Sequence, residues 1–256
     1  MRYTLEVYQI MELGKRKNQE DCMFPNFGEA NTSNRVFIVC DGMGGHAKGE
    51  VASETICKSL GEATSSNTSE IFTENAFHTA LQSAYETLDL KDDGEDEKKM
   101  GTTLTFLKLH SEGATIAHIG DSRVYHIRPG IDATRTQIIF QTTDHSLLND
   151  LIKSGDFTPE EAAAVAPKNV ITRAIQPNMA QRAAADIHHT SDIQAEDCFM
   201  LCSDGILEQL SNENIQHLFS SQTGDFAAKT ELLKQLTAEN RDNHTAIIVH
   251  ITSVEE

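Results

Sequence analysis

The stretch RVFIVCDGMGGHAKGEVAS, residues 35–53, contains the change of pattern that decides the fold. Its apolar run ends at Asp41-Gly42, which predicts a buried strand that closes in a tight turn. A glycine-rich segment follows, and the residues from 48 to about 61 have the spacing of a helix. A strand, a turn that carries a carboxylate and a helix therefore follow one another within this stretch.

Short segments rich in Val, Ile, Thr, Phe and Leu predict further strands on both sides of this stretch. We expect strands at 3–11, 35–40, 102–109, 114–119, 123–128, 136–141, 186–190, 197–202 and 245–251. We expect helices at about 48–61, 70–88, 145–154, 211–220 and 225–238. Runs of strands with helices grouped between them, without regular βαβ alternation, predict an α+β fold with antiparallel sheets.

The composition is that of a folded protein, with 39% hydrophobic and 23% charged residues among 256. Asp and Glu number 39 against 21 Lys and Arg, which gives a formal charge of −18. Because nucleic acids and anionic membranes require a basic face, neither is expected as a partner. No apolar run has the length of a membrane span, and the N-terminal residues lack the pattern of a secretion signal. Five cysteines without a CxxC pair complete the prediction of a reduced, cytoplasmic protein.

An acidic residue recurs at the ends of the predicted strands. The pairs concerned are Glu20-Asp21, Asp41-Gly42, Gly120-Asp121, Asp204-Gly205 and Asp242-Asn243. One Asp-Gly pair is ordinary turn chemistry, but this recurrence predicts that the carboxylates converge on one site. Two carboxylates about 5 Å apart repel by about 3 kcal/mol at an effective dielectric of about 20, so cations or protons must lie among them. All-oxygen ligands select Mg²⁺, Mn²⁺ or Ca²⁺, and adjacent pairs of such ions hydrolyse phosphate esters.

Two phosphate-binding motifs compete for the glycine-rich segment. Residues 42–47 fit GxGxxG/A, but Asp41 would repel a pyrophosphate and no second strand follows at the required distance. A Walker loop fails because Ala47-Lys48-Gly49 stands in place of Gly-Lys-Ser/Thr. The remaining interpretation is a metal-ligating Asp41 on a turn whose glycines let the backbone approach an ion.

The ordered set of motifs resembles the metal-dependent serine/threonine protein phosphatases of type 2C, the PPM family, in its bacterial form. CDGMGGHAKGEVAS is similar to the second motif of that family, and the resemblance runs from about residue 3 to 251. The other motifs, in the family's order, are RKNQED (16–21), MGTT (100–103), GDSRVY (120–125), TDHS (143–146), NVITRA (169–174), CSDG (202–205) and DNHTA (242–246). Each motif alone is weak, whereas the ordered set is specific.

The resemblance implies a four-layer α-β-β-α sandwich, in which helices flank two antiparallel sheets. It implies one catalytic domain over residues 1–256, with a flap-like insertion at about 147–170. It also implies two Mg²⁺ or Mn²⁺ ions, with a third in bacterial members. Asp41 would bridge the first two ions, and the carbonyl of Gly42 would be a further ligand.

The resemblance assigns the remaining site residues as well. Asp21, Asp204 and Asp242 would complete the two main metal sites. Glu20 would contact a metal through water, and Asp121 would share the third site with Asp204. Arg16 matches the phosphate-binding arginine of the family, and a guanidinium is a natural bidentate partner of a phosphoryl group.

The implied function is hydrolysis of phosphoserine and phosphothreonine in proteins, the targets of a serine/threonine kinase, by attack of a metal-bridging hydroxide. Two alternatives remain open at this point. One is a catalytically silent scaffold of the same fold that binds phosphoproteins, and the other is an acidic protein that binds calcium without hydrolysing anything. Met43 departs from the histidine that many eukaryotic relatives carry there as a proposed general acid.

Overall fold

The computed structural model describes residues 1–43, 48–65, 71–94, 99–167 and 170–255. The strands are β1 Arg2–Glu12, β2 Asp21–Phe24, β3 Val36–Met43, β4 Gly101–Thr102, β5 Leu104–His110, β6 Gly113–Ile119, β7 Arg123–Arg128, β8 Gln137–Gln141, β9 Asp186–Thr190, β10 Cys198–Cys202 and β11 His244–Glu255. The helices are α1 Gly49–Ser65, α2 Glu74–Asp89, α3 Leu147–Ser154, α4 Pro159–Val165, α5 Asp204–Leu207, α6 Asn212–Phe219 and α7 Phe226–Thr237. Short 3₁₀ turns occupy Ala133–Arg135 and Ser221–Thr223.

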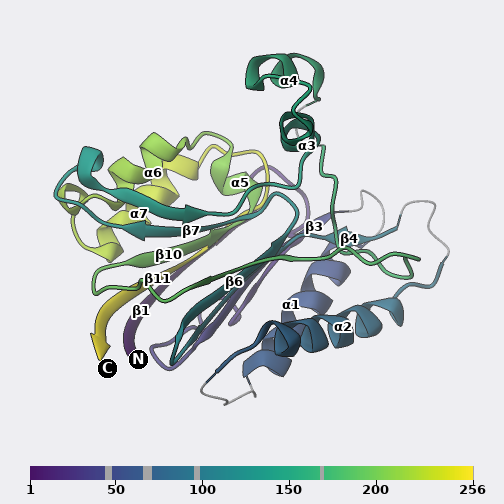
Figure 1. Ribbon diagram of the computed structural model, residues 1–256, viewed down its shortest axis with the longest axis horizontal. Coiled ribbons are helices and arrows are strands. Elements are labelled where there is room, and N and C mark those ends of the chain that lie inside the picture. Colours follow the sequence, from purple (N-terminus) through teal and green to yellow (C-terminus); the bar gives the residue numbers. More distant parts are fainter. Residues whose placement is uncertain (44–47, 66–70, 95–98, 168–169, 256) are drawn as a thin grey trace.

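The strands form two antiparallel sheets that pack face to face. One sheet has the order β1-β11-β10-β7-β8, and the other has the order β2-β3-β5-β6-β9, with β4 paired to β3. Helices α1 and α2 cover one outer face, and α5, α6 and α7 cover the opposite one (Figure 1). The expected four-layer α-β-β-α sandwich is therefore confirmed.

The apolar run of β3 packs against both neighbouring layers. Phe37 and Val39 point into the core between the sheets, whereas Ile38 and Cys40 point toward α1 and α2. This alternation follows from the two-residue period of a strand. Burying one such large side chain contributes about 1.5–3 kcal/mol, and a third apolar cluster joins the other sheet to α5, α6 and α7. Burial on both sides explains why the run contains no alternating polar residues.

All nine expected strands and all five expected helices are present; the strands expected at 123–128 and 186–190 have the predicted ends, and the others differ at one or both ends by a few residues. The helix expected at 70–88 begins at Glu74, because the side chain of Thr73 caps it by accepting from the backbone N–H of Ala76. Strands β2 and β4 and helices α4 and α5 were not expected. Each of these is at most seven residues long, so none repeats its hydrophobic period often enough to be recognised in the sequence. None of the helices in the described part of the chain has the length and apolar character needed to cross a bilayer.

Helices α3 and α4 project from the sandwich beside the ends of the strands (Figure 1). The segment is closed at its base by a bridge between Ser146 and Ile171. Ser146 also caps α3 by accepting from Asn149, and α3 ends at Gly155 in the left-handed conformation, with φ of 81°. The two ends of the segment are thus paired with each other, and the N–H of His145 joins this base to the sandwich by donating to the carbonyl of Gly120.

Candidate metal centre

The acidic residues expected at the strand ends converge on one cavity of about 610 Å³. They arrive from both sheets, since Asp21 begins β2, Asp41 lies near the end of β3, and Asp204 follows β10. Glu20, Asp121 and Asp242 lie in the connections beside the strands and line the same cavity as Asp41 and Asp204. Asp21 is not among the lining residues. The cavity therefore opens at the edge where the two sheets meet.

Sheet register places Asp21 beside Asp41. The two residues are direct partners in the antiparallel pair of β2 and β3. Asp21 accepts a hydrogen bond from the hydroxyl of Ser203, at 2.8 Å, which ties it to the other sheet. The backbone N–H of Asp41 donates to the hydroxyl of Thr103, and its carbonyl accepts from the hydroxyl of Thr102, both at 2.9 Å. These bonds hold the backbone of Asp41 and leave its carboxyl group to the cavity.

Asp121 and Asp204 each present a buried carboxylate oxygen to the site. Among the described residues, Oδ1 of Asp121 and Oδ1 of Asp204 have no hydrogen-bond partner. A buried carboxylate oxygen without a partner carries a free-energy penalty that a bound cation removes. The unsatisfied oxygens and the all-oxygen donor set therefore fit a hard divalent ion such as Mg²⁺ or Mn²⁺.

Arg16 and Asp242 form an ion pair at the mouth of the cavity. Nη2 of Arg16 lies 2.5 Å from Oδ2 of Asp242, and the arginine side chain is 53% exposed. Lys15 and Lys17 line the same cavity, but the amine of Lys15 pairs with the exposed Glu239 at 3.0 Å. Arg16 thus provides a cation beside Asp242 at the entrance.

Gly42 lies in β3 directly after Asp41 and allows the start of α1 to pack directly against the end of this strand. A Cβ atom at residue 42 would overlap the carbonyl oxygen of Gly49 and would lie 2.5 Å from that of Glu20. The N–H of Gly42 donates to the carbonyl of Glu20 at 3.0 Å. The expected tight turn at Asp41-Gly42 is therefore wrong, and the end of β3 joins two of the expected site residues through the backbone.

Asn243 supports the site, although sequence reasoning gave it no role. Its side-chain oxygen accepts from the N–H of Glu20 at 2.8 Å. Its amide group donates to the carbonyls of Leu13 and Asn18. Asn243 thereby fixes the loop that carries Arg16 and Glu20. The position of Asn243, between Asp242 and the first residue of β11, could have identified it from the sequence. A residue there lies at the same end of the strand as the expected ligand Asp242.

Without metal, burial is the main influence on the acidic groups. It raises the pKa of Asp21 to about 7 and that of Asp121 to about 7, with nearby Asp204 adding to both shifts. Burial also raises the pKa of Asp204, and raises that of Asp41 well above its usual value. The charges of Asp21 and Asp204 add to the shift of Asp41. In the metal-free protein, protons thus take the place of cations among these carboxylates.

These pKa values predict that stabilisation by metal grows with pH. Between about pH 4 and pH 7 the native metal-free chain binds more protons than the unfolded chain, so its free energy of unfolding falls as pH rises. Bound metal replaces those protons and removes this loss. Since 1 kcal/mol corresponds to about 2–4 °C in a chain of this size, we expect Mn²⁺ to raise Tm by at least about 3 °C more at pH 8 than at pH 5.5. Thermal melts with Mn²⁺ and with EDTA measure this, and an equal gain at both pH values would contradict it.

His118, His145 and Asp186 form a second group of potential metal ligands that the sequence did not reveal. The N–H of Gly120 donates to Nδ1 of His145, and Nε2 of His145 lies 3.2 Å from Oδ2 of Asp186 and 3.2 Å from Nη1 of Arg173. Nε2 of His118 lies 2.9 Å from the carbonyl of Thr143, which can only accept. Both ring nitrogens of His145 therefore have protein partners that a metal would have to displace. We therefore interpret this group as a hydrogen-bonded support for the base of the α3–α4 segment.

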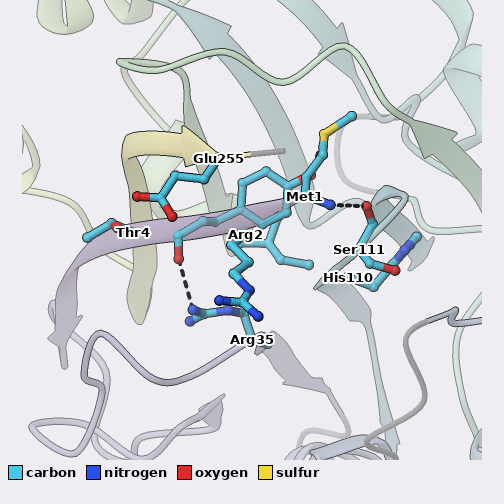
Figure 2. Close-up of a pocket in the computed structure, with 9 residues that line it drawn as sticks. Met1, Arg2, Thr4, Arg35, His110, Ser111 and Glu255 are labelled. Carbon is cyan, nitrogen blue, oxygen red and sulfur yellow. Dashed lines mark hydrogen bonds between the residues drawn. The ribbon is translucent and has the colours of Figure 1, made fainter.

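A separate cavity of about 410 Å³ lies at the far end of the sandwich (Figure 2). It is lined by Arg2 and Arg35, and the amino group of Met1 donates to the carbonyl of Ser111 there. Glu255 is the one carboxylate among its lining residues in the described chain. This mainly basic cavity lacks the clustered oxygen ligands of the acidic one.

A family model, similar sequences and similar structures all relate this chain to one class of protein. Residues 17–242 match the family model of protein phosphatase 2C. The protein phosphatase PhpP of Streptococcus pneumoniae is 33% identical over 256 residues, covering 96% of this chain and 97% of that protein. The crystal structure of Mycobacterium tuberculosis serine/threonine phosphatase PstP/Ppp has a TM-score of 0.76 at 27% identity, covering 97% of this chain and 99% of that one.

A further structure is that of the PstP catalytic domain in complex with two manganese ions. It has a TM-score of 0.76 at 26% identity and covers 98% of this chain and 100% of that chain. The shared class is the metal-dependent serine/threonine phosphatases. The chain belongs to the protein phosphatase 2C family. These relatives give no support to the alternative of a silent scaffold.

Proposed function

We propose that this chain hydrolyses phosphoserine and phosphothreonine in proteins and uses Mg²⁺ or Mn²⁺ as its cofactor. The observation that supports this most directly is the convergence of six carboxylates from both sheets around one cavity, with Arg16 at its mouth. A −18 chain has no electrostatic reason to bury so many acidic groups together unless cations join them.

The residues of the cavity would have two roles, binding metal ions and binding the phosphoryl group. Asp21, Asp41, Gly42, Asp204 and Asp242 would hold two ions, with Glu20 reached through water, and Asp121 with Asp204 would hold a third. When bound, such ions lower the pKa of water and neutralise charge on the phosphoryl group. Arg16 would bind the phosphoryl oxygens and orient the phosphorus, because its guanidinium lies at the entrance beside Asp242. The hydrophobic layers on either side keep the carboxylates in place.

The deciding test is turnover of p-nitrophenyl phosphate and of a phosphothreonine peptide, with and without Mn²⁺. We expect hydrolysis of both substrates, dependent on the metal. A folded chain that binds Mn²⁺ and the phosphopeptide but hydrolyses neither substrate would favour the scaffold alternative.

Arg16→Ala is expected to raise KM more than it lowers kcat. The guanidinium would bind the phosphoryl group in the ground state and in the transition state alike, so its loss weakens uniform binding. We expect KM for p-nitrophenyl phosphate to rise by about tenfold, equivalent to about 1.4 kcal/mol. Lys17→Ala is the matched control, because Lys17 lines the same mouth and should change KM little. An unchanged KM in folded Arg16→Ala would remove this role.

We propose that residues 147–170 act as a flap that selects protein substrates, within a single catalytic domain over residues 1–256. Val165 on α4 is 59% exposed, and no predicted metal ligand lies in the segment. Val165→Ser should therefore lower kcat/KM on phosphorylated casein by about fivefold, or about 1 kcal/mol, with little effect on p-nitrophenyl phosphate. Leu236→Ser on α7, also an exposed apolar residue, is the control. Equal losses on both substrates would show instead that the segment supports the core.

We also propose which partners the enzyme has and where in the cell it acts. Its partners would be phosphoproteins made by a serine/threonine kinase, in cytoplasmic signal transduction, without nucleic acid or membrane. The acidic surface supports this, since it would repel both of those polyanions.

A further inference from the structure

Three cysteines lie together behind the metal centre. Cys22 and Cys40 are direct partners in the antiparallel pair of β2 and β3. Cys57, on α1, packs against the same face of this sheet in the same apolar cluster. Burial raises the pKa of the Cys57 thiol well above its usual value, and the neighbouring Cys22 and Cys40 raise it further, while Cys22 packs against the cluster that contains the other two. Cys57 is thus within reach of both strand cysteines.

The three thiols differ in their access to solvent. Cys22 is partly exposed, whereas Cys40 and Cys57 are buried. A small oxidant dissolved in water therefore reaches Cys22 first, and the nearest buried thiols can then react with the oxidised sulfur. Cys22 directly follows Asp21, and Cys40 directly precedes Asp41, so a change at this cluster is adjacent to two proposed metal ligands.

We propose that Cys22 and Cys57 form a disulfide under peroxide and that this modification lowers the activity of the enzyme. The sulfur of Cys22 attacks one peroxide oxygen, the O–O bond breaks, and the cysteine becomes a sulfenic acid while water leaves. The sulfur of Cys57 then attacks the sulfenic sulfur, the S–O bond breaks, and a second water leaves with the thiol proton. The two cysteines lose two electrons, and hydrogen peroxide is reduced to two molecules of water.

The expected loss of activity has a mechanical cause. An S–S bond is about 2 Å long, which is much shorter than the contact distance of two sulfur atoms that are not bonded to each other. Its formation pulls the start of β2 toward α1, and Asp21 moves with Cys22 because the two are adjacent. Interiors are close-packed, so such a shift also disturbs the hydrogen bond between Asp21 and Ser203. The inhibition rests on the proposed function, whereas formation of the disulfide does not.

The test begins with the unmodified chain, treated with hydrogen peroxide in Mg²⁺ and digested without reducing agent. We expect mass spectrometry to find a peptide pair joined through Cys22 and Cys57, and we expect hydrolysis of p-nitrophenyl phosphate to fall at least about fivefold and to recover with dithiothreitol. Cys198 and Cys202 provide an internal control. Both are buried on β10, about 13 Å apart by their spacing along the strand, so they should remain reduced.

Variants separate this cause from general oxidation. Cys22→Ser should keep its activity after peroxide, and Cys198→Ser should remain as sensitive as the unmodified chain. A disulfide between any other pair, an absence of cross-linking, or a cross-link without loss of activity overturns the proposal. The mapping needs no turnover, so a disulfide found in a chain without phosphatase activity would count against the proposed function and not against the pairing.

Discussion

Asp41→Asn and Asp204→Asn are each expected to reduce kcat by at least a hundredfold, with about 2.7 kcal/mol or more added to the activation barrier. The two residues line the same cavity, and burial with the charges of Asp21 and Asp204 raises the pKa of Asp41 well above its usual value, so each would contribute negative charge to the same ions. Asparagine keeps the shape but removes the charge, which lowers affinity for Mg²⁺ and Mn²⁺ together. Steady-state kinetics over a range of Mn²⁺ concentrations measures the effect on both kcat and metal affinity.

The control for these variants is Asp156→Asn. Asp156 is exposed in the connection between α3 and α4 and does not line the acidic cavity, so kcat on p-nitrophenyl phosphate should stay within about twofold. If either site variant, folded and supplied with Mn²⁺, kept more than about a tenth of the original kcat, its assignment as a direct metal ligand would be wrong.

Gly42→Ala is expected to destabilise the fold by about 3 kcal/mol or more and to abolish most activity. The added methyl group would overlap the carbonyl of Gly49 and crowd that of Glu20, and backbone cannot move aside as a flexible side chain can. The start of α1 and the loop that bears Glu20 must then move away from the end of β3. This movement shifts Asp41, which is next to Gly42 in the same strand. Urea unfolding, with turnover measured on the same samples, gives both quantities.

A second glycine separates crowding from backbone preference. Gly155, at the end of α3, has a φ of 81° but nothing within 4 Å of an added Cβ. Gly155→Ala should therefore cost only the left-handed conformation, about 1–2 kcal/mol, and leave turnover of p-nitrophenyl phosphate unchanged. Equal destabilisation by the two substitutions would show that close packing at Gly42 is not what requires a glycine there.

The sequence predicted those strands and helices in which one hydrophobic pattern extends over the whole element. The run that ends at Asp41 was identified because burial on both faces makes it continuously apolar. Strand β2 was missed because it has four residues and joins the sheet through its pairing with β3, which is a long-range contact. Local patterns do not record such contacts, since β pairing depends on what lies beside the strand.

The site also combines residues that local sequence patterns predict with contacts that depend on long-range packing. The acidic residues could be selected because each one ends or precedes a recognisable strand. The supporting contacts of Ser203 and Asn243 could not, because their partners lie 182 and 223 residues away along the chain. The pairing of Asp186 with His145 was also invisible, since Asp186 enters β9 after the entire α3–α4 segment. Distances of this kind are set by topology and not by spacing in the sequence.

The pairing of the first strand with the last, β1 with β11, determines when a growing chain can acquire its activity. Asp21 and Asp41 leave the ribosome early, but they must wait for Asp204, Asp242 and the strand that follows. Translation adds about 5–20 residues per second, so a nascent chain carries Asp21 and Asp41 for at least about ten seconds before Asp242 is added. During that interval it has these acidic residues without the cavity that would concentrate metal.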